Sequence, residues 1–175
     1  ISLFWFALLA DVIPHHLLTA RVEEYPSSLK PYREMLRGRS MLVKKANVFP
    51  VECVVRGYLA GSGWKEYQKS RTVCGERLAD GLKESSEIEP AIFTPSTKAD
   101  AGHDENISFS KMSEIIGPKD AGSLKTKSIE LYTKARNYAR SRGIIIADTK
   151  FEFGRGANGV ITLIDEVLTP DSSRF

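Results

Sequence analysis

Apolar side chains recur along this chain at two different spacings, which predicts a protein that mixes helices with strands. A spacing of three to four residues indicates a helix, because such positions share one helical face, whereas strict alternation indicates a strand. Leu3, Phe6, Leu9 and Ile13 show the helical spacing. The predicted elements, in chain order, are a helix over 3–20, strands over 41–45 and 51–59, a short helix over 64–70, a long helix over 121–142, and strands over 144–153 and 160–168. This order predicts the α+β class.

Two segments interrupt this pattern. Residues 47–50 join the first two predicted strands and are a candidate hinge. Residues 84–110 show little periodicity and are rich in Pro, Ser, Thr and Asp, so we expect a long loop there. A loop of that length within a compact domain is usually either functional or disordered.

Composition and charge exclude several classes of protein. The 175 residues are 42% hydrophobic and 27% charged, and the net charge of +3 comes from dispersed basic residues, which does not indicate nucleic-acid binding. Cys53 and Cys74 lack metal-site or disulfide-rich spacing, so we expect reduced thiols in a cytoplasmic protein. The apolar run Ile1–Ala10 is shorter than the ~20 residues that cross a bilayer, and it lacks signal-peptide features. We therefore expect no membrane association.

The strongest candidate chemistry lies in the predicted hairpin at residues 144–168. Strand alternation places Asp148, Lys150 and Glu152 on one face of the first arm. Asp165 falls within an apolar run of the second arm, where an unpaired buried carboxylate would be costly. Acids on adjacent strands with a lysine between them fit a Mg²⁺–nucleotide site, because Mg²⁺ prefers oxygen ligands and an amine pairs with phosphate. The alternative is a solvent-facing strand with a ladder of charges.

A second candidate is the strand and turn over residues 51–63. Arg56 lies on an apolar strand, and small residues after it lead into the next predicted helix. Arg56 would bind an anion through its guanidinium fork, while Ser62 and the unpaired N–H groups of the helix supply further donors. The segment is not a Walker P-loop, since no GK[ST] follows at the required spacing. The alternative is a strand–turn–helix junction in which Arg56 pairs with Glu52.

The loop over residues 94–106 is a third candidate, because it gathers Lys98, His103 and Asp104 in a place where binding residues often lie. Its composition is equally that of a solvated loop. No second histidine lies at ligand spacing, which disfavours a metal role for His103. Lys44 ends the strand before the connector and is positioned to contact a nucleotide phosphate, although lysines are common at strand edges.

Taken in order, these three segments resemble the signature segments of the SAICAR synthetases, which are phosphoribosylaminoimidazole-succinocarboxamide synthases. Residues 51–63 resemble the family's EVVVRxxxxGS stretch, residues 94–106 resemble TPSTKA…GHDEN, and residues 148–174 resemble DTKFEFG…DEVLTPDSSR. The resemblance runs along essentially the whole chain. It implies a fold of two lobes, similar to ATP-grasp and kinase-like nucleotide binders. Residues 1–46 would be the remnant of an N-terminal nucleotide-binding lobe, and 47–175 the second lobe.

The resemblance also implies an ATP- and Mg²⁺-dependent ligase of purine biosynthesis that joins carboxyaminoimidazole ribotide to L-aspartate through an acyl phosphate. Each site residue is matched to a family position. The matches are Arg56, Ser62, Ser173 and Arg174 for the ribotide, Lys98, Asp104 and Lys150 for the reacting groups, Lys44, Val48, Glu52 and Asp148 for the nucleotide, and Glu152 and Asp165 for Mg²⁺.

The departures from the family lie at the two ends. No GKVRD-type glycine-rich loop precedes Ile1, and no tryptophan-containing segment follows Phe175. Because the sequence does not start on methionine, we expect both natural termini to lie outside it. The main alternative is then an inactive fragment with partial ligand binding. A nucleic-acid module using the Arg and Lys residues of the 121–142 helix is disfavoured, because the basic residues of the chain are dispersed and mixed with acids. The sequence does not indicate an oligomeric state.

Overall fold

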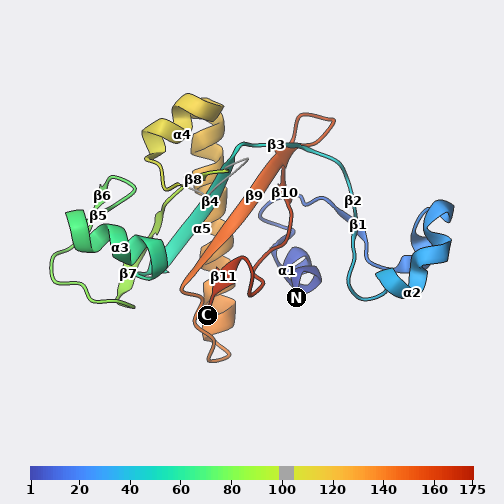
Figure 1. Cartoon of the computed structure of the whole chain (residues 1–175), viewed down its shortest axis with the longest axis horizontal. Helices are drawn as coiled ribbons and strands as arrows, with labels where there is room; N and C mark the ends of the chain where they lie inside the picture. Colours follow the sequence, from blue (N-terminus) through green and yellow to red (C-terminus); the bar gives the residue numbers. More distant parts are fainter. Residues whose placement is uncertain (99–104) are drawn as a thin grey trace.

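The computed structural model describes residues 1–98 and 105–175 and confirms the α+β class (Figure 1). The helices are α1 (Ser2–Leu9), α2 (Arg33–Leu36), α3 (Gly61–Ser70), α4 (Phe109–Ile116) and α5 (Pro118–Arg140), with 3-10 turns η1 (Val22–Glu24) and η2 (Ser27–Tyr32). The strands are β1 (Leu17–Thr19), β2 (Leu42–Val43), β3 (Asn47–Val48), β4 (Val51–Tyr58), β5 (Thr72–Val73), β6 (Glu76–Arg77), β7 (Glu87–Phe93), β8 (Ser96–Thr97), β9 (Asp148–Arg155), β10 (Ile161–Ile164) and β11 (Ser173–Arg174).

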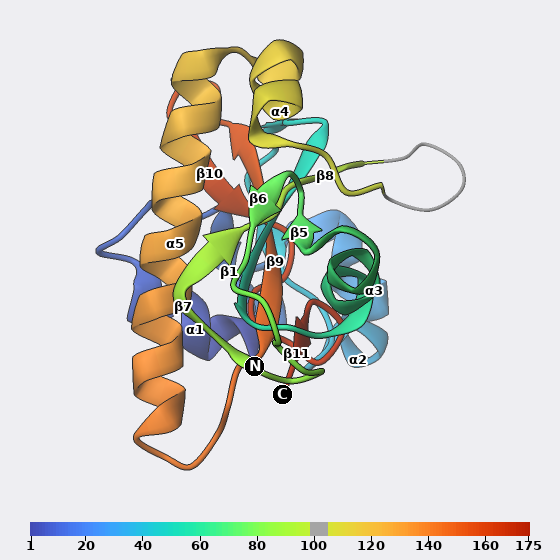
Figure 2. The ribbon, with the colours of Figure 1, turned by 90° about the vertical axis from the view of Figure 1, so that its left-hand side faces the viewer.

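Strand β9 is the centre of the main sheet, which has seven strands within the described residues. The order β10–β9–β4–β7 is antiparallel throughout, β3 and β11 also pair with β9, and β8 pairs with β4. Alternation along β9 sends Phe151 and Phe153 into the core. Figure 2 shows the long helix α5 lying along one face of this sheet. The charged face of β9 is therefore the face away from the main core.

One apolar core joins the sheet to α1 and α5. Phe6 and Leu9 of α1 are each 1% exposed and belong to the same cluster as Phe151 and Leu131. The hydroxyl of Tyr132 on α5 donates to the carbonyl oxygen of Ile146 at 2.7 Å. Residues of the first 13 positions thus pack against the main sheet and α5, and the predicted domain boundary near residue 46 stays a prediction.

The segment between α1 and the main sheet forms a separate small unit. β1 and β2 pair with each other in a two-stranded sheet, and η1, η2 and α2 lie beyond them, on the right of Figure 1. A second apolar cluster lies on the other side of the main sheet, around α3. It contains Leu59, Tyr67, Val73, Cys74, Ile88 and Ile92.

Several predicted elements differ from the structure. The helix over 3–20 ends at Leu9, because the chain turns at Pro14 and the His16 amide donates to the carbonyl oxygen of Leu163 at 3.1 Å. The expected loop over 84–110 contains β7, β8 and the start of α4. Residues 47–48 of the connector form β3, which pairs with β9, and the Phe49 amide donates to the carbonyl oxygen of Phe153 at 3.0 Å, while the hinge role of the connector stays a prediction.

No helix within residues 1–98 and 105–175 is long and apolar enough to cross a membrane. Cys53 and Cys74 are both buried free thiols, as the sequence predicts. Burial raises the pKa of each thiol to about 12.

Candidate functional site

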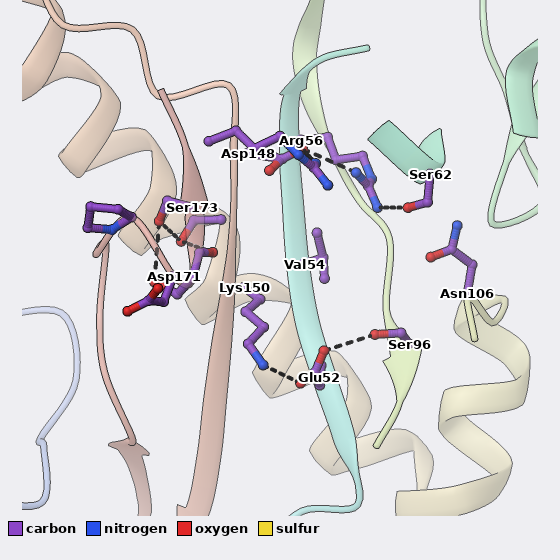
Figure 3. A pocket seen from close by; sticks show the side chains of 14 residues that line it. Glu52, Val54, Arg56, Ser62, Ser96, Asn106, Asp148, Lys150, Asp171 and Ser173 are labelled. Atoms are coloured by element: carbon purple, nitrogen blue, oxygen red, sulfur yellow. Dashed lines mark hydrogen bonds and ion pairs between the residues drawn. The ribbon is translucent and has the colours of Figure 1, made fainter. Parts of the chain in front are cut away.

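A polar cavity of about 390 Å³ lies on the charged face of the sheet, beside the first turn of α3 (Figure 3). Its walls come from β4, β9, β11 and the chain around β8, so residues far apart in the sequence meet there. The lining residues are Glu52, Val54, Arg56, Ser62, Ser96, Asn106, Asp148, Thr149, Lys150, Pro170, Asp171, Ser172, Ser173 and Arg174.

At one end of the cavity, two arginines flank a single carboxylate. Asp148 is in register with Arg56 on β4 and with Arg174 on β11, so the three residues form a row across three strands. Arg56 Nη1 donates to Asp148 Oδ2 at 3.2 Å, and Arg174 Nη1 donates to the same oxygen. Asp148 and Arg56 are 4% and 3% exposed. The shared carboxylate stabilises two guanidinium groups that would otherwise repel each other.

The Arg56 guanidinium is fixed on three sides. Besides Asp148, its Nε donates to Thr94 Oγ1 at 2.9 Å and its Nη2 donates to Ser62 Oγ at 3.0 Å. Burial lowers the pKa of Arg56 from its usual value, and the nearby Asp148 carboxylate opposes that effect. Nη1 and Nη2 each carry two N–H bonds and use one of them in these contacts, whereas Nε carries a single N–H bond and uses it. Arg56 therefore retains donors for a ligand.

The first turn of α3 closes the same end of the cavity. Gly61 has φ of +57°, and a Cβ atom there would lie 2.5 Å from Arg174 Nη2. A Cβ atom at Gly63 would lie 3.1 Å from Arg56 Cδ. No side chain caps the N-terminus of α3, so no cap residue accepts a hydrogen bond from the first N–H groups of the helix. Two arginines, a serine hydroxyl and a helix N-terminus together form an anion-binding arrangement.

The middle of the cavity carries lysine–glutamate pairs. Lys150 Nζ donates to Glu52 Oε1 at 2.5 Å and lies 3.7 Å from Glu152 Oε1. Lys98 Nζ donates to Glu152 Oε2. Glu52 and Glu152 are 5% and 7% exposed, and their charges are balanced by these ammonium groups. Asp148, Lys150 and Glu152 thus share one face of β9, which confirms the predicted alternation.

The structure brings most of the predicted site residues together. Seven of them line this cavity, namely Glu52, Arg56, Ser62, Asp148, Lys150, Ser173 and Arg174. Lys98 and Glu152 adjoin it through the Lys150–Glu152 contact. Asp148, matched in sequence to the nucleotide, lies with the arginines instead. The alternative pairing of Arg56 with Glu52 is wrong, because the two residues are four positions apart on β4, which separates them by ~13 Å.

Lys44 and Val48 lie toward the opposite end of β9. Val48 pairs with Gly154 and is half exposed. Lys44 lines a second cavity of about 320 Å³, which lies between residues 44–46 and the turn of the hairpin over 156–162. His15 and His16 also line this second cavity, and burial lowers the pKa of both. Asp104 lies outside the described residues.

The metal prediction for Glu152 and Asp165 stays a prediction. Within residues 1–98 and 105–175, no group of three or more His, Cys, Asp or Glu side chains is arranged to hold a metal ion. Glu152 is in register with Ile164, which places Asp165 one residue beyond the pair. Asp165 is exposed, with φ of +62°, so the expectation of a buried carboxylate was wrong. The positive φ ends β10 and breaks the strand alternation there.

Sequence reasoning missed several polar residues that line the cavity or contact its lining residues. Thr94 and Ser96 fix Arg56 and Glu52, since Ser96 Oγ donates to Glu52 Oε2 at 3.4 Å. Asn106 contributes a side-chain amide from beyond β8. All three belong to the segment over 94–106, in which the lysine, the histidine and the acids were considered as candidate residues and the neutral polar residues were not.

The fold and the cavity define a class of protein: an α+β domain with a polar cavity, lined by two arginines, on the open face of its sheet. Comparisons with known proteins agree with this class. A family model for SAICAR synthetase matches residues 1–175. The chain belongs to the SAICAR synthetase family.

Curated relatives are identical to this chain at more than half of the aligned positions. The phosphoribosylaminoimidazole-succinocarboxamide synthase of Desulfatibacillum aliphaticivorans is 57% identical over 176 residues, covering 100% of this chain and 59% of the relative. That of Thermodesulfovibrio yellowstonii is 55% identical over 175 residues, covering 100% of this chain and 60% of the relative. The chain therefore spans about three fifths of the length of these relatives.

Solved structures show the same fold. A SAICAR synthase from Saccharomyces cerevisiae, complexed with SAICAR, superposes with a TM-score of 0.89 at 44% identity, covering 99% of this chain and 59% of that one. A SAICAR synthetase in complex with ADP superposes with a TM-score of 0.75 at 27% identity, covering 99% of this chain and 63% of that one.

Proposed function

We propose that the intact protein joins carboxyaminoimidazole ribotide to L-aspartate with the hydrolysis of ATP to ADP and phosphate. The observation that carries this proposal is the convergence of Arg56, Arg174 and Ser62 at one end of a cavity whose middle holds lysines. Family membership supports it, because curated members of similar sequence are named for this ligase. A purine-pathway enzyme of this kind would work in the cytoplasm.

The arginine end of the cavity is suited to the ribotide phosphate. A phosphate monoester carries about two negative charges near neutral pH. Arg56 and Arg174 bring two positive charges against the one negative charge of Asp148, which leaves a net attraction for the ligand. Ser62, Ser173 and the first turn of α3 add neutral donors, which suit phosphate oxygens without adding charge.

The middle of the cavity is suited to the reacting carboxylate. In the proposed reaction, an oxygen of the imidazole carboxylate attacks the γ-phosphorus of ATP, and ADP leaves. The aspartate amine then attacks the acyl carbon, phosphate leaves with the bonding pair, and the amine loses a proton. Lys150 and Lys98 would neutralise charge as it builds on the transferring group. Asp104 is a further proposed contact to the ribotide.

The nucleotide would lie toward the Lys44 and Val48 end of β9. Val48 belongs to the connector, whose backbone groups would contact the base, and Lys44 would face the phosphates. Glu152 and Asp165 would hold Mg²⁺, since both offer the carboxylate oxygens that this ion prefers. A bound Mg²⁺ would neutralise phosphate charge. Glu152 would then exchange part of its lysine contacts for the metal.

The test is an ADP-release assay on the intact protein with ribotide, ATP and aspartate, each omitted in turn. We expect ADP release only when all three are present, with succinocarboxamide formed in equal amount. ADP release that does not depend on aspartate would refute the ligase. Binding of ribotide and MgATP in calorimetry without any ADP release would instead favour the alternative of an inactive protein with partial binding.

A further inference from the structure

Asn106 presents a side-chain amide to the cavity whose orientation is set by another residue. Its Nδ2 donates to Glu66 Oε2 at 3.0 Å. The second carboxylate oxygen of Glu66 accepts the backbone amide of Cys74 at 2.8 Å. Figure 3 places Asn106 on the same side of the cavity as Ser62. Glu66 is thus held at both oxygens, and it holds Asn106 in turn.

The chemistry of this contact decides which end of the amide faces the ligand. A carboxylate accepts hydrogen bonds and cannot donate, so only the NH₂ end of Asn106 can meet Glu66. The Oδ1 atom is left on the cavity side. No residue within 1–98 or 105–175 donates a hydrogen bond to it. Asn106 therefore presents an acceptor in a cavity whose arginine end presents mainly donors.

Glu66 is also linked to the anion-binding end of the cavity. It follows Ser62 by four residues on α3, so both side chains lie on one face of that helix. Ser62 accepts from Arg56, while Glu66 accepts from Asn106. Burial lowers the pKa of Arg56, and the carboxylate of Glu66 is one of the nearby charges that oppose this effect. One helix face thereby fixes a donor group and an acceptor group relative to each other.

We propose that Asn106 is a specificity-determining residue, which accepts a hydrogen bond from an O–H or N–H group of the bound ribotide, and that Glu66 is its positioning residue. This inference rests on the proposed function. The shared chemistry is a donor on the ligand, supplied either by a ribose hydroxyl or by the amine of the imidazole. A ligand that offers an acceptor at that point would be rejected by the Oδ1 lone pairs.

Replacing Glu66 by glutamine should reverse the polarity of Asn106. In E66Q the backbone amide of Cys74 still needs an acceptor, so the oxygen of the introduced side-chain amide stays there and its NH₂ group turns toward Asn106. The Asn106 amide then flips, and its NH₂ end faces the cavity. We expect ribotide Kd to rise about 2- to 12-fold, the range for one neutral hydrogen bond, with MgATP Kd unchanged.

The decisive comparison uses N106A, E66Q and the double variant in calorimetry on the intact protein. We expect N106A to weaken ribotide binding by a similar factor, and E66Q to add nothing in the N106A background, because Glu66 acts through Asn106. Ribose 5-phosphate identifies the donor, because it has hydroxyl groups but no amine. If N106A raises the Kd for ribose 5-phosphate as well, the contact is to a hydroxyl. If N106A raises only the Kd for the ribotide, the contact is to the amine. E114Q, an exposed helical glutamate paired with Lys111, is the matched control and should leave every Kd unchanged.

The outcomes separate this inference from the proposed function. If the unaltered protein does not bind ribotide, the proposed function fails. If it binds ribotide and N106A binds equally well, the role of Asn106 is refuted. If E66Q weakens binding further in the N106A background, Glu66 acts on the fold of α3, and its positioning role is refuted. The thermal midpoint of each variant checks that the variants remain folded.

Discussion

Replacing Arg174 by alanine should weaken phosphate binding with little effect on folding. The Arg174 side chain is 50% exposed and pairs with Asp148, whose second partner, Arg56, stays in place at 3.2 Å. Asp148 therefore remains paired in the variant. The loss of stability should be about 1 kcal/mol or less, the range for exposed ion pairs.

The expected loss of binding follows from the hydrogen bonds that Arg174 has available. A hydrogen bond to a charged group contributes about 1.5–3 kcal/mol, which corresponds to a rise in ribotide Kd of roughly 10- to 150-fold. Titration calorimetry on the intact protein measures this Kd directly. The Kd for MgATP should stay the same, because Arg174 lies at the opposite end of β9 from Val48.

A matched arginine provides the control. Arg140 is 53% exposed and pairs with Glu87, so R140A removes a similar ion pair far from the cavity. R140A should bind both ligands with unchanged affinity. An unchanged ribotide Kd in R174A would refute the placement of the phosphate. An equal loss of ribotide and MgATP affinity would indicate partial unfolding rather than a lost contact.

Three further predictions concern packing and pH. Gly61→Ala should weaken ribotide binding in calorimetry, because the added Cβ would displace the Arg174 guanidinium. Gly122→Ala, whose added Cβ would meet nothing within 4 Å, should stabilise α5 by about 0.5–1 kcal/mol in urea unfolding. Phe6→Ala should cost about 3–5 kcal/mol of unfolding free energy and the exposed Leu3→Ala on the same helix far less; equal costs would contradict the shared core. Burial holds the pKa of the Cys53 thiol near 12 in the folded chain, against 9.0 in the unfolded chain. The contribution of this thiol to stability is therefore complete below pH 9 and is lost as pH rises toward 12. Cys53→Ala should flatten the fall in urea midpoint between about pH 8 and pH 10.

Local periodicity was enough to predict the charged face of β9. Alternation with a period of two assigns Asp148, Lys150 and Glu152 to one side whatever the rest of the fold does. The same rule could not name their partners. Arg56 meets Asp148 across 92 residues of sequence, and only the strand order and register make them neighbours. The grouping of these residues in one site came from the family resemblance.

Helix α4 shows the opposite case, where a local signal was present but was not recognised. Ser108 caps the helix by accepting the Lys111 amide at 3.1 Å, and Gly117, with φ of +87°, separates α4 from Pro118 at the start of α5. A serine cap and a Gly-Pro break are readable signals. The long polar stretch before Ser108 led to the prediction of a loop that runs past the start of α4. The end of α1 was harder to predict, because it depends on the tertiary hydrogen bond from His16 to Leu163.

Strand β9 also fixes the distance between two charged clusters, which are Asp148 with its two arginines and Glu152 with its two lysines. Its two charged clusters belong to one strand, and residues 148 and 152 are ~13 Å apart at a rise of ~3.3 Å per residue. Loop movement cannot change that span, because β9 is paired along both edges by β3, β4, β10 and β11. A molecule whose phosphate and reacting group are separated by a different length would reach one cluster and miss the other. Inserting one residue into β9 would turn the residues beyond it to the opposite face, so the span can change only in steps of two residues.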